Sequence, residues 1–377
     1  MQRDPLGADE DGAAPSGSGV PATMTAMRLH RYGGPDVFQA DIVPVPDVGP
    51  DDVLVRVGML AVNGWDARVR QGRAPQLPGR RPIELPIQPG REMVGQVAAI
   101  GAGVHLVDIG ERVVLSSAPS CNDCAFCFSG RGNLCTRIDY PGHARPGTYA
   151  QYAVFPQSWL LKAPAGLTDE EIVSIPWAYG NAMHAVLAGT VSLGETVAVT
   201  AASSAMGIAC IQLAKLQGAK TVIALSRSPD KADRLLEAGA DHVVDYTGPE
   251  GIERVKGIAG APPFGGVDVV LDNYGGQEMM DLAVAITGFQ GRIVMIAWQG
   301  EAWDGTVAVP GLIALGKELR VITSRGSLYA EQQHAVALAA AGRITMPVQS
   351  IFALEEMSRA HEELDSGRHV GKILVRA

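Results

Sequence analysis

Residues 196–324 constrain the fold more than any other part of this chain. Apolar runs rich in β-branched residues alternate there with stretches of helical periodicity, in the order TVAVT, GIACIQLAKLQ, TVIALS, DKADRLLEAG, VDVVLD, QEMMDLAVAI, GRIVMIA and LRVITS. Regular alternation of strand and helix with short turns is typical of a doubly wound parallel sheet. We therefore predict an α/β domain of this class.

Two further stretches frame this segment. Residues 51–153 show short alternating strands broken by Gly and Pro, with Val53, Val55 and Val57 as the clearest case, which predicts a β-barrel-like domain. After Tyr329 another helical pattern leads to a last helix and strand, and this tail need not belong to the nearer domain. The length of 377 residues fits two domains.

Composition excludes several classes of protein. The chain has 31 basic and 40 acidic residues, a net charge of −9 and no basic block, so nucleic acid and anionic membranes are poor partners. Residues 1–22 lack the apolar core of a secretory signal and indicate a disordered acidic tail. The sequence contains no run of about 18 uninterrupted apolar residues, so we expect no membrane-spanning helix. We expect a cytoplasmic protein that binds a small-molecule substrate.

Four of the five cysteines lie within fifteen residues, in CNDCAFCFSGRGNLC, at Cys121, Cys124, Cys127 and Cys135. Two C-x-x-C steps followed by a fourth thiolate suit one tetrahedral Zn²⁺ with no open coordination position, which makes such a site structural. Iron–sulfur ligation would favour a C-x3-C-P ending that is absent here. Disulfides are the remaining alternative, in a chain without an export signal. We predict one structural zinc per chain.

The turn at 200–207 joins the first strand of the predicted sheet to its helix, where such units bind the pyrophosphate of a dinucleotide. Only Gly207 remains of the usual glycine pattern, but Ala and Ser also leave room for a phosphate, and seryl hydroxyls can donate to it. A plain strand-to-helix turn is the alternative. The candidate residues are Ala202, Ser203, Ser204, Ala205, Met206 and Gly207.

The end of the second predicted strand indicates which dinucleotide binds. An acidic residue there would bond the adenosine ribose, but the chain has Ser226 and Arg227, followed by Lys231. The guanidinium fork of Arg227 and the point charge of Lys231 suit a 2′-phosphate, which favours NADPH over NADH. A solvated surface is the alternative role for both cations.

Several motifs together make the chain resemble the medium-chain dehydrogenase/reductase superfamily over 23–377. They are GREMVG at 90–95, the four-cysteine lobe, the small-residue turn, LDNYGG at 271–276 and VGKIL at 370–374. The resemblance implies a GroES-like catalytic domain at 23–171 and 327–377, with its zinc lobe at 116–138, and an inserted Rossmann NADP-binding domain at 172–326. It also implies an active site between the domains, and a homodimer or homotetramer with residues 319–324 near the subunit contact.

The departures from the superfamily pattern concern the catalytic metal. The positions that match the Cys, His and Cys ligands of zinc alcohol dehydrogenases hold Asn63, Arg91 and Trp177, none of which replaces thiolate or imidazole. We therefore expect no catalytic zinc. The segment AVNGWD at 61–66 instead resembles the zinc-free quinone oxidoreductases, and VDY at 244–246 matches that branch, in which Tyr246 would lie beside the 2′-phosphate.

We hypothesise that Arg91 occupies the vacated metal space and pairs with Asp66, because a buried guanidinium needs an acidic partner. A purely structural role for this pair is the alternative. The resemblance places Asn63 as a neutral donor and Asn181 against the nicotinamide, with Asn273 also at the cofactor. Tyr179 is a candidate proton donor or, alternatively, a packing residue, and Trp65 and Trp177 are expected to line an apolar cleft.

Three functions follow from these residues. The leading one is an NADPH-dependent reductase of quinones or α,β-unsaturated carbonyls, in which hydrogen-bond donors stabilise the delocalised oxyanion without a metal. The second is a zinc-independent NADP-dependent alcohol dehydrogenase or ketone reductase for a specialised substrate. The third is a non-catalytic NADPH-binding regulatory protein. Residues 67–86 belong to the cleft loops that set specificity, and they carry no recognisable motif.

Overall fold

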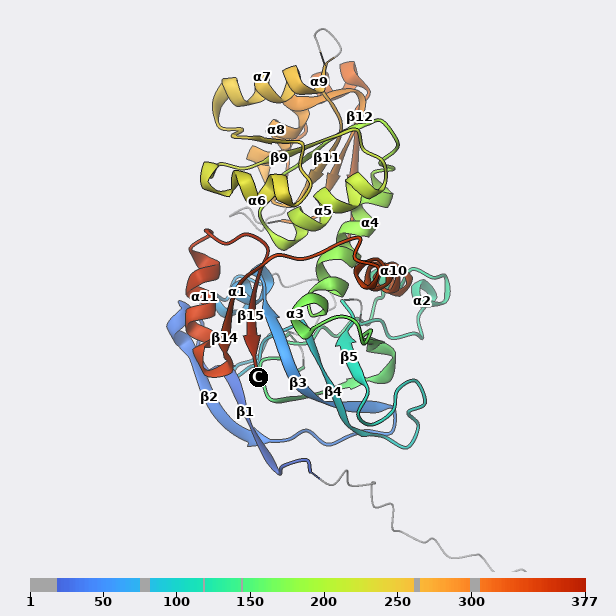
Figure 1. The fold of residues 1–377 in the computed structure, drawn as a ribbon, viewed down its shortest axis with the longest axis vertical. Coiled ribbons are helices and arrows are strands. Elements are labelled where there is room, and N and C mark those ends of the chain that lie inside the picture. Colours follow the sequence, from blue (N-terminus) through green and yellow to red (C-terminus); the bar gives the residue numbers. More distant parts are fainter. Residues whose placement is uncertain (1–18, 75–81, 118, 144, 261–264, 299–305) are drawn as a thin grey trace, which may run out of the picture.

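The computed structural model describes residues 19–74, 82–117, 119–143, 145–260, 265–298 and 306–377. Most of the predicted tail at 1–22, and part of the cleft loop at 67–86, lie outside these ranges. Figure 1 shows two lobes, one yellow and orange and one blue and cyan, with red C-terminal elements returning to the blue lobe.

The yellow and orange lobe, here called the sheet domain, is built on six parallel strands. Across the sheet they follow the order β10 (His242–Val244), β9 (Thr221–Leu225), β8 (Thr196–Val199), β11 (Val267–Asp272), β12 (Thr287–Met295) and β13 (Arg320–Thr323). The winding direction reverses beside β8, and ligands of open α/β sheets bind at the carboxyl ends of strands at such a point. The predicted doubly wound fold is confirmed.

Helices cover this sheet. They are α5 (Ala205–Leu216), α6 (Ala232–Glu237), α7 (Gly248–Ala259), α8 (Gln277–Ile286) and α9 (Gly311–Lys317). The apolar periods predicted α5, α6 and α8, and α5 buries Ile208 and Ile211 completely. Sequence patterning did not predict β10, which has only three residues, nor α7 and α9, which carry several glycines.

The blue and cyan lobe, here called the barrel domain, contains a seven-stranded sheet. Its order is β14 (Val348–Ala353), β15 (Lys372–Arg376), β3 (Asp52–Val62), β4 (Met93–Ile100), β5 (Arg112–Leu115) and β7 (Leu160–Lys162), and β6 (Tyr152–Pro156) also pairs with β3. Strands β1 (Thr23–Leu29) and β2 (Phe38–Pro44) form a separate antiparallel pair. The last strand, β15, lies antiparallel to β3, so the C-terminal tail belongs to this domain and not to the nearer one.

The remaining helices connect and cover the barrel. They are α1 (Gly64–Arg70), α2 (Ala125–Phe128), α3 (Asp169–Ile172), α4 (Gly180–Ala188), α10 (Tyr329–Ala340) and α11 (Met357–Asp365). A π-helical turn, Ile175–Tyr179, leads directly into α4 and carries Trp177. Such turns occur often at functional sites. The two domains are therefore joined through the segment that holds one of the expected cleft residues.

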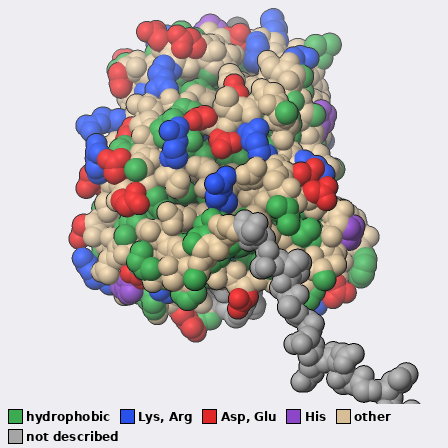
Figure 2. All heavy atoms as spheres, turned by 60° about the horizontal axis from the view of Figure 1, so that its bottom comes forward, with side chains coloured by type: hydrophobic (Ala, Val, Ile, Leu, Met, Phe, Trp, Pro, Cys, Tyr) green, Lys and Arg blue, Asp and Glu red, His purple; other side chains and the backbone are tan. Residues whose placement is uncertain are grey.

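The surface mixes charges of both signs. Figure 2 shows Lys and Arg side chains interspersed with Asp and Glu on the face it displays, without a broad patch of either sign. Among the helices of the described ranges, none is long and apolar enough to cross a membrane.

Candidate functional site

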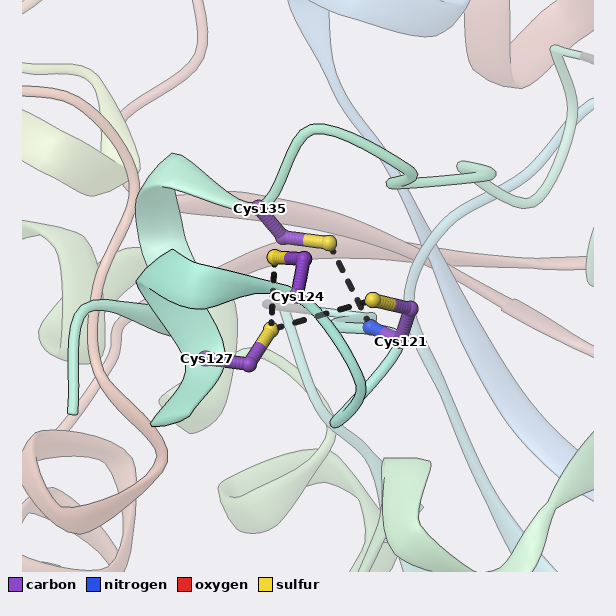
Figure 3. Close-up of side chains that lie close together, drawn as sticks. All are labelled: Cys121, Cys124, Cys127 and Cys135. Atoms are coloured by element: carbon purple, nitrogen blue, oxygen red, sulfur yellow. Dashed lines mark hydrogen bonds between the residues drawn. The ribbon is translucent and has the colours of Figure 1, made fainter. Parts of the chain in front are cut away.

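The four-cysteine lobe gathers its sulfur atoms into one cluster, drawn in Figure 3. All four Sγ atoms lie within 4.8 Å of one another, with Cys124–Cys127 at 3.5 Å and Cys121–Cys127 at 3.9 Å. Four thiolates at the usual Zn–S distance of about 2.3 Å are about 3.8 Å apart, so the cluster fits a tetrahedral Zn²⁺. None of the four is in a disulfide, which removes the disulfide alternative.

Backbone N–H groups point at these sulfurs. Asp123 donates to Cys121 Sγ at 3.4 Å and Arg137 donates to Cys135 Sγ at 3.3 Å. Hydrogen bonds from the backbone N–H groups of Cys127 and Thr136 lower the pKa of Cys124 to about 5, whereas burial raises that of Cys135 to about 12. Binding of Zn²⁺ would deprotonate all four thiols, and these N–H groups would then stabilise the thiolates.

The predicted phosphate turn follows β8, and its one glycine is enforced by close packing. A Cβ on Gly207 would lie 2.4 Å from the carbonyl oxygen of Ala201 and 2.5 Å from that of Ala202. Ala201 adopts a positive φ of 44°, and Ser204 caps α5 by accepting from Gly207 N at 3.0 Å. The helix N-terminus and a tight backbone of small residues fit a pyrophosphate.

The end of β9 brings together the groups predicted to select the dinucleotide. Ser226 and the exposed Arg227 follow the strand directly. Burial raises the pKa of Tyr246, and the nearby Arg227 guanidinium opposes this shift. The Lys231 ammonium is buried and donates to Ser203 Oγ at 3.1 Å and to the carbonyl of Gly367 at 2.6 Å, and its role at the 2′-phosphate stays a prediction. This lysine therefore contacts the phosphate turn and the barrel domain.

Asn273, which the resemblance places at the cofactor, forms two hydrogen bonds with Thr200. Its backbone N–H donates to Thr200 Oγ1 at 2.9 Å, and its side-chain amide donates to the Thr200 carbonyl at 3.3 Å. Asp272 accepts from the same Thr200 hydroxyl at 2.7 Å. The Asn273 side chain ties the end of β11 to the end of β8, at the carboxyl edge of the sheet, and its role at the cofactor stays a prediction.

Tyr179 is also a packing residue. Its ring is fully buried, and its hydroxyl lies 2.9 Å from Gln212 Oε1 and 2.7 Å from the carbonyl of Thr345. Burial raises its pKa further above the ordinary value, which disfavours ionisation. Of the two roles predicted for Tyr179, the burial of its ring and the contacts of its hydroxyl favour packing. Asn181, two residues on, stays partly exposed, and its Oδ1 accepts from Ser117 Oγ at 3.5 Å.

Asn63 is buried at the start of α1 and is occupied in three hydrogen bonds. Its Oδ1 accepts from the backbone N–H groups of Trp65 at 2.9 Å and Asp66 at 3.2 Å, which makes it the N-cap of the helix. Its Nδ2 donates to Glu92 Oε1 at 3.0 Å, and Lys372 Nζ lies 2.5 Å from the same oxygen. Asn63 thus holds the helix and Glu92 in place.

Arg91 lies in an aromatic cage. Its guanidinium carbon is 4.4 Å from the ring centre of Trp65, 4.7 Å from that of Tyr140 and 5.8 Å from that of Trp177. The residue is 4% exposed, and burial lowers its pKa to about 10. Its Nε and Nη2 atoms are buried and have no hydrogen-bond partner among the residues described. Tyr140 was not predicted from the sequence, because no motif marks it.

The proposed Arg91–Asp66 ion pair does not form. Within the described part of the chain, no nitrogen of Arg91 comes within 4.0 Å of the Asp66 carboxylate, although each group affects the pKa of the other. Asp66 accepts instead from the hydroxyl of Tyr149 at 3.0 Å, and burial raises its pKa to about 7. That hydroxyl also lies 3.1 Å from Nε2 of the buried His361. A half-neutral Asp66 does not need to pair with the arginine.

A cavity of about 750 Å³ also opens on the barrel domain, but it does not contain the candidate residues. Its arginines are engaged with neighbours, as the contacts Arg56–Gln96 and Arg112–Asp169 show. The aromatic cage is the candidate site, because a buried guanidinium with two unpartnered nitrogen atoms lies there.

Two family models match the chain. The alcohol dehydrogenase GroES-like domain matches residues 49–165, and the zinc-binding dehydrogenase model matches residues 238–375. L-threonine 3-dehydrogenase of Rhizobium etli (strain CIAT 652) is 33% identical over 262 residues, which is 66% of this chain and 73% of that protein.

Solved structures agree with these matches. A crystal structure of an NAD-dependent alcohol dehydrogenase has a TM-score of 0.85 and 32% identity, covering 94% of this chain and all of that one. A zinc-binding dehydrogenase from Sinorhizobium meliloti 1021, bound to NADP, has a TM-score of 0.80 and 28% identity over 95% of this chain and all of its own. The GroES-like and Rossmann architecture is confirmed.

Proposed function

We propose that this chain is an NADPH-dependent reductase of quinones or α,β-unsaturated carbonyls without a catalytic zinc. It belongs to the zinc-type alcohol dehydrogenase superfamily of medium-chain dehydrogenases/reductases, which are oxidoreductases. The observation that carries the proposal is the buried, unpaired guanidinium of Arg91 at a position where the superfamily places a metal ligand.

The donor set argues against a second zinc. Asn63 offers an amide that is already committed to the α1 cap and to Glu92, and Trp177 offers no metal ligand. Arg91 would repel a cation. A buried positive charge surrounded by aromatic rings can instead stabilise the negative oxygen that develops when a conjugated carbonyl is reduced.

NADPH, when bound, would supply a hydride to a carbon of the conjugated system. The electron pair of the π bond that is reduced would then reside on the carbonyl oxygen, and a proton from solvent would complete the product. Arg91 attracts that oxygen, and the rings of Trp65, Tyr140 and Trp177 exclude water around it. The preference for NADPH is supported by Arg227 beside Tyr246 and by the absence of an acidic residue directly after β9.

A second candidate is reduction of a ketone, or oxidation of an alcohol, by the same NADP-linked route. The names of the similar proteins favour it, since they include an L-threonine dehydrogenase and an NAD-dependent alcohol dehydrogenase. Without a Lewis acid, Arg91 alone would have to stabilise a localised alkoxide, which is harder than stabilising a delocalised enolate.

The test is NADPH consumption, followed at 340 nm, against quinones, enones, aldehydes and ketones, with NADP-linked oxidation of an alcohol panel alongside it. We expect turnover of quinones or enones and about one zinc per chain by elemental analysis. Turnover confined to alcohols and ketones would support the second candidate. Tight NADPH binding with no turnover would indicate a regulatory protein, and two zinc atoms per chain would contradict the metal-free mechanism.

A further inference from the structure

The unpaired atoms of Arg91 lie on one edge of its guanidinium. Nε–H and the adjacent Nη2–H point in nearly parallel directions, and together they form the fork with which arginine binds a carboxylate through two bonds. Both atoms are buried without a hydrogen-bond partner among the residues described. One bidentate binding edge is therefore empty.

Aromatic rings lie close to the guanidinium that carries this edge. Trp65 and Tyr140 lie 4.4 and 4.7 Å from the guanidinium carbon, so both rings are within stacking distance of the planar cation. Trp65, Tyr140 and Trp177 are each partly exposed, so the cage is open to the solvent on at least one side. A flat ligand can approach between these rings and meet the fork.

The acidic groups around Arg91 are engaged elsewhere. Glu92 is paired with Lys372 at 2.5 Å in a buried contact, and Asp66 accepts from Tyr149. A buried cation without a counter-ion is costly, and leaving it unpaired lowers its pKa. An anion from outside the chain would satisfy it.

We propose that the substrate carries a carboxylate, which the side-on fork of Arg91 binds through both oxygens inside the Trp65–Tyr140–Trp177 cage. This inference rests on the proposed function and names its substrate class: a conjugated carbonyl compound that is also an acid, such as an oxo-enoate. Anchoring the carboxylate next to the reducible bond fixes the orientation of that bond relative to the hydride donor.

The geometry favours a carboxylate over a lone carbonyl. A planar pair of oxygens matches two parallel N–H groups, whereas a single oxygen leaves one of them poorly satisfied. Burial makes the difference large, because a desolvated donor without an acceptor is unfavourable.

The first test measures binding without turnover. Benzoate and benzamide have the same shape, and only benzoate carries the two equivalent anionic oxygens, so we would titrate each into the NADP⁺-loaded enzyme by isothermal calorimetry. We expect benzoate to bind at least about tenfold more tightly than benzamide. Equal affinities for the two ligands in the wild-type enzyme would overturn the proposal without any variant being made.

Variants locate the binding edge. In Arg91→Gln the preference for benzoate should disappear, and in Arg91→Lys, which keeps the charge but lacks the fork, it should become smaller than in the wild type without disappearing. Arg131→Gln is the matched control, because Arg131 lies 5.2 Å from the ring of Phe126 in the zinc lobe, outside the cage. Thermal melting would show that each variant is folded, and an Arg91→Gln variant that retains the preference would contradict the assignment.

The second test uses matched substrates. 3-Benzoylacrylate should have a kcat/KM at least about tenfold above that of its methyl ester, mainly through KM. Benzoate binding without turnover of any acceptor would refute the proposed function but keep the carboxylate site. Turnover of neutral enones or quinones at the rate of the acid would keep the function and refute the carboxylate.

Discussion

Replacing Asp66 with asparagine should change how the stability of this protein depends on pH. Burial raises the pKa of Asp66 from 3.8 to about 7, against the opposing attraction of Arg91 and the hydrogen bond from Tyr149. In the unfolded chain this carboxyl loses its proton near pH 4. Between pH 4 and 7 the folded state therefore holds a proton that the unfolded state has released.

The sign follows from linkage. Because the folded pKa lies above the unfolded one, the contribution of Asp66 is most favourable below pH 4 and is lost as the pH rises to 7. A shift of about three units at 1.36 kcal/mol each limits this loss to about 4 kcal/mol. Asparagine cannot ionise, and its Oδ1 can still accept from the Tyr149 hydroxyl, so the variant avoids the loss.

The assay is the melting temperature of wild type and Asp66→Asn between pH 5 and 8.5. We expect the melting temperature of the variant, relative to that of the wild type, to increase as the pH rises. This difference should be up to roughly 10 °C larger at pH 8 than at pH 5. Asp36→Asn, which alters an exposed carboxylate paired with Arg31, serves as the control, and its difference from wild type should not follow this course. A difference between Asp66→Asn and wild type that is the same at pH 5 and pH 8 would refute the reasoning.

Three further outcomes are expected. Cys124→Ser should lower the zinc content well below one per chain and reduce the melting temperature, which elemental analysis and thermal melting would detect. Arg227→Gln should raise KM for NADPH about tenfold or more while leaving KM for NADH nearly unchanged, and an equal effect on both would remove Arg227 from 2′-phosphate binding. We also propose that the chain forms a homodimer through α9 and the edge strand β13, because Leu312 and Leu315 are 85% and 76% exposed there. A variant with both Leu312→Glu and Leu315→Glu should have the molar mass of a monomer in light scattering.

Patterning predicted most of the fold, because the strongest signals are local. The apolar alternation marked β8, β9, β11, β12 and β13 directly, since each is a buried strand flanked by turns. Three-residue β10 is too short for its period to stand out. The pairing of β15 with β3 joins residues far apart in the sequence, and local patterning could not decide to which domain the C-terminal tail belongs.

The zinc lobe was predictable for a different reason. Four cysteines at short spacing restrict the chain so strongly that their Sγ atoms can meet without help from distant residues. The cofactor residues were harder to assign, because a polar residue at a strand end can face the ligand or the neighbouring strand. Asn273 faces Thr200, and only the structure distinguishes the two orientations.

The Arg91–Asp66 pair shows why charge complementarity in a sequence is weak guidance for contacts in a core. Asn63 caps the first turn of α1, and Asp66 in that turn accepts a hydrogen bond from the Tyr149 hydroxyl. Burial then raises the pKa of Asp66 to about 7, so that it is a weak counter-ion at neutral pH. Arg91 consequently keeps an empty fork in an aromatic cage, and the charge that balances it has to come from the ligand.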